Sequence, residues 1–158
     1  NQVLIGLALF LTFFIMWPTF TQINENAITP LDNGEITQEE ALDRAVEPIR
    51  NFMYGQTQEK DLKLFCEISD TTYEDYDDIP FVVLVPSFIL SELRTAFIIG
   101  VVIYIPFIVI DMVVSSVLMS MGMMMLPPTT ISLPFKILLF VLADGWNLVI
   151  GGLVKTFY

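Results

Sequence analysis

The 158-residue sequence contains no histidine and a single cysteine, Cys66. Catalytic triads that need an imidazole base, zinc sites built from His and Cys, and disulfide frameworks therefore lack the residues that they require. The sequence also has no glycine-rich loop of the kind that binds nucleotide phosphates. These absences predict that the protein is not an enzyme and uses neither a cofactor nor a metal. They also predict that Cys66 is a small buried apolar residue.

Basic residues are scarce as well, with 7 Lys and Arg against 18 Asp and Glu, which gives a net charge of −11. A surplus of this sign repels phosphate backbones and argues against a nucleic-acid partner. Charged residues make up only 16% of the chain and hydrophobic residues 54%, with a mean hydropathy of +0.67, whereas a soluble domain carries roughly 25% charged residues. The composition therefore excludes an ordinary cytosolic globule and indicates a membrane-associated protein.

The surplus of acidic residues lies in one part of the chain. Residues 25–78 contain 15 acidic and 4 basic side chains, which is the whole excess. The sequence divides into the end of an N-terminal apolar helix (1–18), an acidic water-facing helical segment (19–80) and a C-terminal apolar helical hairpin (81–158) with a Met-rich loop at 119–134. We therefore expect an all-α fold of membrane-associated helical hairpins with a small acidic helical segment.

The first apolar run, from Val3 to Trp17, has 15 residues and falls short of the roughly 20 that cross a bilayer as a helix. No basic segment precedes it, so it makes a poor secretory signal as it stands. We interpret it as the tail of a longer membrane helix. Trp17 and Pro18 would then lie at the membrane interface.

Two short helices are expected in the acidic segment. The string TQEE at 37–40 is a capping box, so a helix should begin there. Pro48 should kink this helix midway. Its apolar residues recur at three- and four-residue steps and predict one buried stripe of Leu42, Ala45, Val46, Ile49, Phe52 and Met53. A second helix is predicted from Gln58 to Ile68, with the inward residues Leu62, Phe65 and Cys66. The acidic run YEDYDD at 73–78 lacks the glycine and trailing glutamate of a calcium loop and is expected to be solvated surface.

The acidic segment is too small to bury a large core alone, so we expect it to pack on copies of itself or on neighbouring chains. After it, Pro80 and Pro86 bracket the string FVVLV. Each proline disfavours the helical conformation in the residue before it, which predicts an extended segment there. Ser87 would then cap a new helix.

The apolar run at 95–126 is too long for a simple span, because 32 helical residues extend about 48 Å and the hydrocarbon core is ~30 Å thick. It must tilt, break or lie outside a normal bilayer, and Pro106 and Gly122 are the expected breaks. A further apolar stretch at 135–154 has the right length to pair back on it as an antiparallel hairpin turning near Pro128.

Three ionisable residues stand inside these apolar segments, namely Asp111, Lys136 and Asp144. A lone charge in lipid is costly, so each should face protein or water. In an ideal hairpin the two acids share a depth and Asp111 does not reach Lys136. The pair meets if the helix ends early, near Gly122, and the loop folds back, or if a neighbouring subunit is staggered. Snorkelling to an interface and a proton relay through the carboxylates remain as alternatives.

Methionine is concentrated next to the expected turn, where five of the eight methionines lie within seven residues: Met119, Met121, Met123, Met124 and Met125. Their flexible thioether side chains conform to irregular surfaces and can close around a passing chain. Hydrophobic constrictions also gate by excluding water. Gap-filling in a membrane core is an equally good interpretation of this cluster.

Small residues on the last apolar stretch permit close helix packing. The glycines that we expect to serve this role are Gly145, Gly151 and Gly152.

The chain closely resembles the FliP family of bacterial flagellar biosynthetic proteins in four strings: NQVLIGLALFLTFFIM, LVPSFILSELRTAFIIG, IPFIVIDMVVSSVLMSMGMMMLPPTTISLPF and KILLFVLADGWNLVIGGLVKTFY. The resemblance covers the whole chain and is most specific in its C-terminal half, whereas only EEAL and EPIRNFM are similar in the acidic middle. Family members usually carry a cleaved signal sequence and a further apolar helix ahead of this point, so we expect the chain to be incomplete.

The resemblance implies a subunit of the flagellar type III protein export gate in the bacterial inner membrane, at the flagellar basal body. Several copies would assemble with FliQ and FliR, with FlhB and FlhA as further partners, and unfolded export substrates would pass through the channel. The acidic segment would be periplasmic. The resemblance further implies that Met123, Met124 and Met125 form a pore gasket and that Asp111 and Lys136 form a buried charge pair.

Rival interpretations remain at this stage. Injectisome export-gate proteins share the PFK and DGW strings, although the opening LIGLALFLTFFIM favours the flagellar branch. A small ion-coupled membrane transporter would use Asp111 and Asp144 as proton sites. A purely structural assembly scaffold would need neither the charges nor the methionines for transport.

Overall fold

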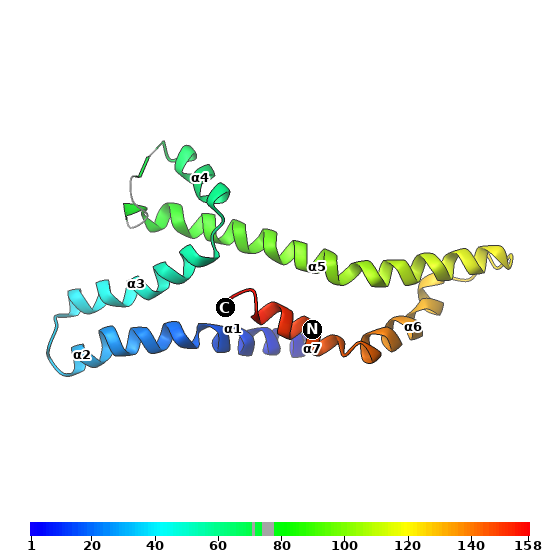
Figure 1. Cartoon of the computed structure of the whole chain (residues 1–158), viewed down its shortest axis with the longest axis horizontal. Helices are drawn as coiled ribbons and strands as arrows, with labels where there is room; N and C mark the ends of the chain where they lie inside the picture. The colour runs from blue at the N-terminus through cyan, green and yellow to red at the C-terminus, as the bar shows by residue number, and fades with distance from the viewer. Residues whose placement is uncertain (71, 74–77) are drawn as a thin grey trace. The chain divides into compact units, whose positions relative to one another are not determined.

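The computed structural model describes residues 1–70, 72–73 and 78–158, which contain helices and no strand. The elements in chain order are α1 (Gln2–Ile23), the π-helix η1 (Asn24–Ile28), α2 (Thr29–Asp32), α3 (Gln38–Gln56), α4 (Glu59–Ile68), α5 (Phe81–Ser120), α6 (Pro128–Leu142) and α7 (Gly145–Val154) (Figure 1). The predicted all-α fold is confirmed. The chain forms two compact units, Asn1–Arg94 and Thr95–Tyr158, so the division falls within α5.

Among the residues that the structure describes, two helical segments are long and apolar enough to cross a membrane, Gln2–Asp32 and Phe81–Ser120. The bent pair of α6 and α7 would make a third if it acts as one span. The first segment differs from the sequence-based expectation, because α1 continues through Pro18 to Ile23 and leads into η1 and α2. The helix that contains the apolar run therefore continues beyond Trp17 and Pro18, where the membrane interface was expected.

In the first unit, α3 packs against α1 and η1. Small side chains lie buried in this region, Ala27 on η1 and Ala41 on α3, and they let two helix backbones approach closely. The predicted stripe on α3 is therefore only partly correct. Leu42 and Ile49 are exposed, whereas the buried residues of α3 are Ala41, Pro48 and Met53. The helical period was predictable, but the face that α1 covers was not.

The start of α3 confirms the predicted capping box. The Glu40 amide donates to Thr37 Oγ1 at 3.3 Å, and the Thr37 amide donates to Glu40 Oε2 at 3.0 Å. The helix then continues through Pro48 to Gln56.

The second predicted helix is confirmed to within one residue, since α4 begins at Glu59 and ends at Ile68. Its inward residues were also predicted correctly. Leu62 lies in the buried core of the first unit, and Phe65 and Cys66 pack against that core. The buried members of this core come from α3, α4, the segment before α5 and α5 itself: Met53, Leu62, Ile79, Val83 and Leu84. Most of the acidic run at 73–78 lies outside the described residues.

The expected extended FVVLV segment is wrong, because α5 begins with it at Phe81. The Val83 amide donates to the Pro80 carbonyl at 2.9 Å, which starts the helix. Ser87 is therefore not a cap; its hydroxyl donates to the Val83 carbonyl of the same helix at 2.6 Å. Burial of Val83 and Leu84 in the core outweighs the local bias that the prolines impose.

The break expected at Pro106 is also wrong, since α5 is helical from Phe81 to Ser120. Its 40 residues extend about 60 Å at 1.5 Å per residue. The break expected at Gly122 is correct, because the helix ends two residues earlier and Gly122 has a positive φ of 74°.

The second arm of the hairpin begins earlier than predicted and is not one helix. It consists of α6, from Pro128, and α7, and the two helices are bent by 61° at Ala143 and Asp144. Asp144 takes the left-handed conformation there, with φ 50°. The loop between α5 and α6 is correspondingly shorter than the 119–134 expected and covers only 121–127.

Candidate functional site: a partly shielded charge pair beside a methionine-rich turn

The turn between α5 and α6 is closed by a defined backbone motif. The Met123 amide donates to the Leu118 carbonyl at 3.0 Å, and the Gly122 amide donates to the Met119 carbonyl at 3.1 Å. This is the Schellman arrangement, which requires a left-handed residue at the position that Gly122 occupies. Only glycine adopts that conformation without steric cost, so Gly122 fixes where α5 ends.

The methionines of this turn project away from the chain. The exposed fractions are 43% for Met123, 83% for Met124 and 99% for Met125. Met121 on the same turn is exposed as well, at 61%. The turn therefore presents a cluster of flexible apolar side chains that the chain itself does not cover.

Below the turn, the structure brings Asp111 of α5 and Lys136 of α6 together. Lys136 Nζ lies 2.6 Å from Asp111 Oδ2, and the two side chains are 21% and 25% exposed. This contact arises because α5 ends near Gly122 and α6 begins already at Pro128, which brings α6 back alongside α5. An ideal hairpin that turned near Pro128 would have kept the two charges apart.

Ser132 is a third member of this cluster, and the sequence analysis missed it. Its hydroxyl donates to Asp111 Oδ1 at 2.5 Å, and the residue is fully buried. A signal was present, because Ser132 and Lys136 are four residues apart and so share one face of α6. Both oxygens of the Asp111 carboxylate thus have a donor from α6.

Asp144 does not join this cluster. It lies at the break between α6 and α7, is exposed, and accepts a hydrogen bond from Asn147 Nδ2 at 3.1 Å. The two acids expected to share a depth are therefore in different surroundings.

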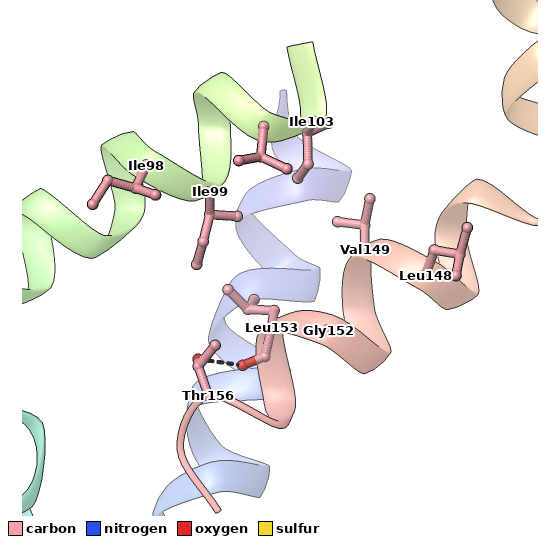
Figure 2. A pocket seen from close by; sticks show the side chains of 9 residues that line it. Ile98, Ile99, Ile103, Leu148, Val149, Gly152, Leu153 and Thr156 are labelled. Atoms are coloured by element: carbon pink, nitrogen blue, oxygen red, sulfur yellow. Dashed lines mark hydrogen bonds between the residues drawn. The ribbon is translucent and has the colours of Figure 1, made fainter. Parts of the chain in front are cut away.

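The three glycines predicted to serve helix packing also differ from one another. Gly145 is buried, and a Cβ added there would lie 2.4 Å from the Phe140 ring. Gly151 and Gly152 have space around them. Gly152 lines an apolar groove of about 310 Å³, where residues of α7 face Ile99 and Ile103 of α5 (Figure 2).

A second polar cluster, in the first unit, was also missed. Asp61 of α4 is only 1% exposed and accepts hydrogen bonds from Ser91 Oγ at 2.8 Å and from Arg94 Nη2 at 2.7 Å. The Gln58 amide donates to Ser91 Oγ at 2.9 Å. This cluster fixes the start of α4 to α5. Within the described residues, no three His, Cys, Asp or Glu side chains gather as metal ligands.

Comparison with known proteins places this geometry in a family. A model of the FliP family matches residues 1–153. The chain is 60% identical over 158 residues to the flagellar biosynthetic protein FliP of Bacillus subtilis, covering 99% of this chain and 72% of that protein. It is 51% identical to the FliP of Pectobacterium carotovorum, covering 100% of this chain and 62% of that protein. It is 52% identical to a FliP of Buchnera aphidicola, covering 99% of this chain and 42% of that protein. The chain thus spans less than two thirds of the last two relatives.

Proposed function

The chain belongs to the FliP family, and from this premise we propose that it is a subunit of the bacterial flagellar type III protein export gate. In this proposal several copies assemble with FliQ and FliR in the inner membrane at the flagellar basal body, and FlhB and FlhA act with them. Unfolded flagellar proteins pass through the channel that the subunits surround. The flagellar branch is favoured over the injectisome branch because the relatives compared above are flagellar biosynthetic proteins.

The part of the chain that would close the channel is the turn at Met123, Met124 and Met125. The observation that carries this assignment is that these side chains are exposed at the tip of a backbone turn that Gly122 holds in a fixed shape. Thioether side chains adapt to irregular surfaces, so a ring of such turns can fit around a passing polypeptide. When no polypeptide is present, the same side chains exclude water and ions from the constriction.

The charge pair would hold the two helices that carry this turn. Asp111 precedes the end of α5 by nine residues, or about 14 Å of helix, and Lys136 lies on α6, which follows the turn. This partly shielded ion pair joins the two helices, so it helps to define how α6 lies on α5 and thereby where the turn points.

The site gives no support to an ion-coupled transporter. Lys136 and Ser132 already occupy both oxygens of Asp111, and Asp144 lies at a different place on the chain. A non-enzymatic gate subunit, with its energy supplied by other components, accounts better for this arrangement.

The gasket role is tested by replacing Met123, Met124 and Met125 together with alanine. We expect the complex to assemble normally but to leak small ions, because three long apolar side chains are removed from the constriction. Assembly is checked by co-purification, and the leak is measured as ion flux from vesicles that contain the purified complex, where we expect a several-fold increase.

The matched control is Met112→Ala, which shortens an exposed methionine on α5 away from the turn. This variant should leave the ion flux at the wild-type level. Wild-type flux in a correctly assembled triple variant would contradict the gasket role.

A further inference from the structure

We propose that Ser132 is a positioning residue of the charge pair. It orients the carboxylate of Asp111 toward Lys136, and so sets how α6 lies on α5. The link from this arrangement to gate closure rests on the proposed function above. The positioning itself concerns three side chains and can be tested separately.

The geometry is that of two donors on one carboxylate. Ser132 Oγ lies 2.5 Å from Asp111 Oδ1, and Lys136 Nζ lies 2.6 Å from Asp111 Oδ2. The lysine side chain has four rotatable carbon bonds, so on its own it fixes a carboxylate poorly. Serine has one side-chain torsion and therefore loses little entropy when it holds the other oxygen. With both oxygens held, rotation of the carboxylate is stopped.

The Ser132 hydroxyl has two possible acceptors, and the distances show to which of them it donates. Its Oγ also lies 3.1 Å from the Thr129 carbonyl of its own helix. A hydroxyl carries a single hydrogen, and a charged acceptor at the shorter distance makes the stronger bond. The hydrogen of Ser132 is therefore given to Asp111, across to the other helix.

Burial makes this bond necessary. Ser132 is fully shielded from solvent, so its hydroxyl cannot donate to water in place of Asp111. Ser87 is an instructive comparison because it is equally buried, yet its hydroxyl donates to the Val83 carbonyl of its own helix. One buried serine thus joins two helices, and the other supports a single helix.

The test is a double-mutant cycle on the assembled complex, read as the midpoint temperature of its thermal disassembly. Ser132→Ala should lower the midpoint by several degrees in the wild-type background. In the Asp111→Ala background the same change should cause little further loss, because the group that Ser132 positions is gone. If Asp111→Ala prevents assembly, Asp111→Asn serves as the second background, where the loss should be smaller than in the wild type.

Two further variants separate the hydroxyl group from the volume of the side chain. Ser132→Cys fills the same space with a weak donor and should behave like Ser132→Ala, whereas Ser132→Thr keeps the hydroxyl and should restore most of the midpoint. Ser87→Ala is the matched control, and its effect should be the same whether residue 111 is Asp or Ala.

An equal loss from Ser132→Ala in both backgrounds would overturn the proposal, because the serine would then act only within its own helix. A Cys variant as stable as the wild type would overturn it as well. The ion flux of Ser132→Ala tests the link to the gate. The cycle could show coupling between Ser132 and Asp111 while neither Ser132→Ala nor the triple methionine variant increases the ion flux. In that case the positioning role of Ser132 would stand, and the proposed gasket role would be rejected.

Discussion

A buried carboxylate is stable only when its partners replace the water that it has lost, and Asp61 shows how complete that replacement is. Its side chain is 2% exposed and is bonded to Ser91 and Arg94. The neighbouring Glu59 makes an ion pair with Lys63 in which both side chains are more than two-thirds exposed. The Lys63 ammonium lowers the pKa of the Glu59 carboxyl, chiefly through a hydrogen bond. Asp61 and Glu59, which are two residues apart on α4, should therefore contribute very differently to the stability of the fold.

We predict that Asp61→Ala destabilises the first unit by about 3 kcal/mol, the lower end of the range for breaking a buried pair, because Arg94 remains partly solvated at 37% exposure. Asp61→Asn should cost less, since the amide oxygen can still accept one hydrogen bond. Glu59→Ala is the control and should have little effect, because solvent screens its pair with Lys63. The measurement is denaturant unfolding in detergent, followed by the helical circular dichroism signal. Equal losses for the Asp61 and Glu59 variants would contradict this prediction.

For single residues, interactions with neighbours in the sequence could be predicted, whereas contacts with residues far away in the sequence could not. The capping box at 37–40 and the glycine at position 122 were predictable because each acts on backbone within four residues of itself. The roles of Ser132 and Asp61 were not, because each depends on a partner 21 or 30 residues away. Asp111 and Lys136 were singled out because a charge in apolar sequence demands a partner, and their pairing with each other was implied only by the family resemblance.

Helix boundaries show the same contrast between local preference and packing. Pro80 and Pro86 locally disfavour helix before them, yet α5 begins at Phe81 because Val83 and Leu84 complete a core with α3 and α4. Pro106 likewise lies inside α5 without ending it. The break before α7 falls at the dipeptide Asp144-Gly145, a turn signal that the sequence analysis did not use, and Asp144 is the left-handed residue there.

The attachment of α6 to α5 yields a prediction at the scale of elements. Asp111→Ala or Lys136→Ala alone should reduce the yield of assembled complex several-fold, because each leaves a partly shielded charge without its partner. The double variant should assemble better than either single variant, since neither charge remains. Yield is measured by affinity purification followed by size-exclusion chromatography.

Lys155→Ala is the control for this series, because Lys155 follows the end of α7 and lies away from the Asp111 cluster. It should assemble at the wild-type level. A double variant no better than the single variants would show that the 2.6 Å contact between Asp111 and Lys136 contributes nothing specific to assembly.

For the molecule as a whole, the order of apolar, acidic and apolar segments was the most predictable property. It follows from the positions of 25 charged residues and needs no knowledge of tertiary contacts. The proposed assembly cannot be derived from any such pattern, because apolar side chains are exposed along most of α1 and α5 and do not single out one contact surface.

The periplasmic placement of the acidic segment, which the family resemblance implies, can be tested by labelling. If the acidic segment is periplasmic, a cysteine introduced as Asp43→Cys on exposed α3 should react in spheroplasts with a maleimide that does not cross membranes, in a Cys66→Ser background. Val113→Cys, on the apolar α5, should react poorly under the same conditions. Labelling of position 43 only after the membrane is permeabilised would place the acidic segment on the cytoplasmic side instead.

The length of α5 has a further consequence for the life of the protein in the cell. About 60 Å of helix is twice the thickness of the hydrocarbon core, and its apolar side chains are largely exposed on the isolated chain. A newly made copy therefore exposes more apolar surface than the hydrocarbon core of a bilayer can cover. Copies that stay unassembled are expected to aggregate or to be degraded by quality-control proteases. If the chain assembles with partner subunits as proposed, its abundance should follow the supply of those subunits rather than its own rate of synthesis.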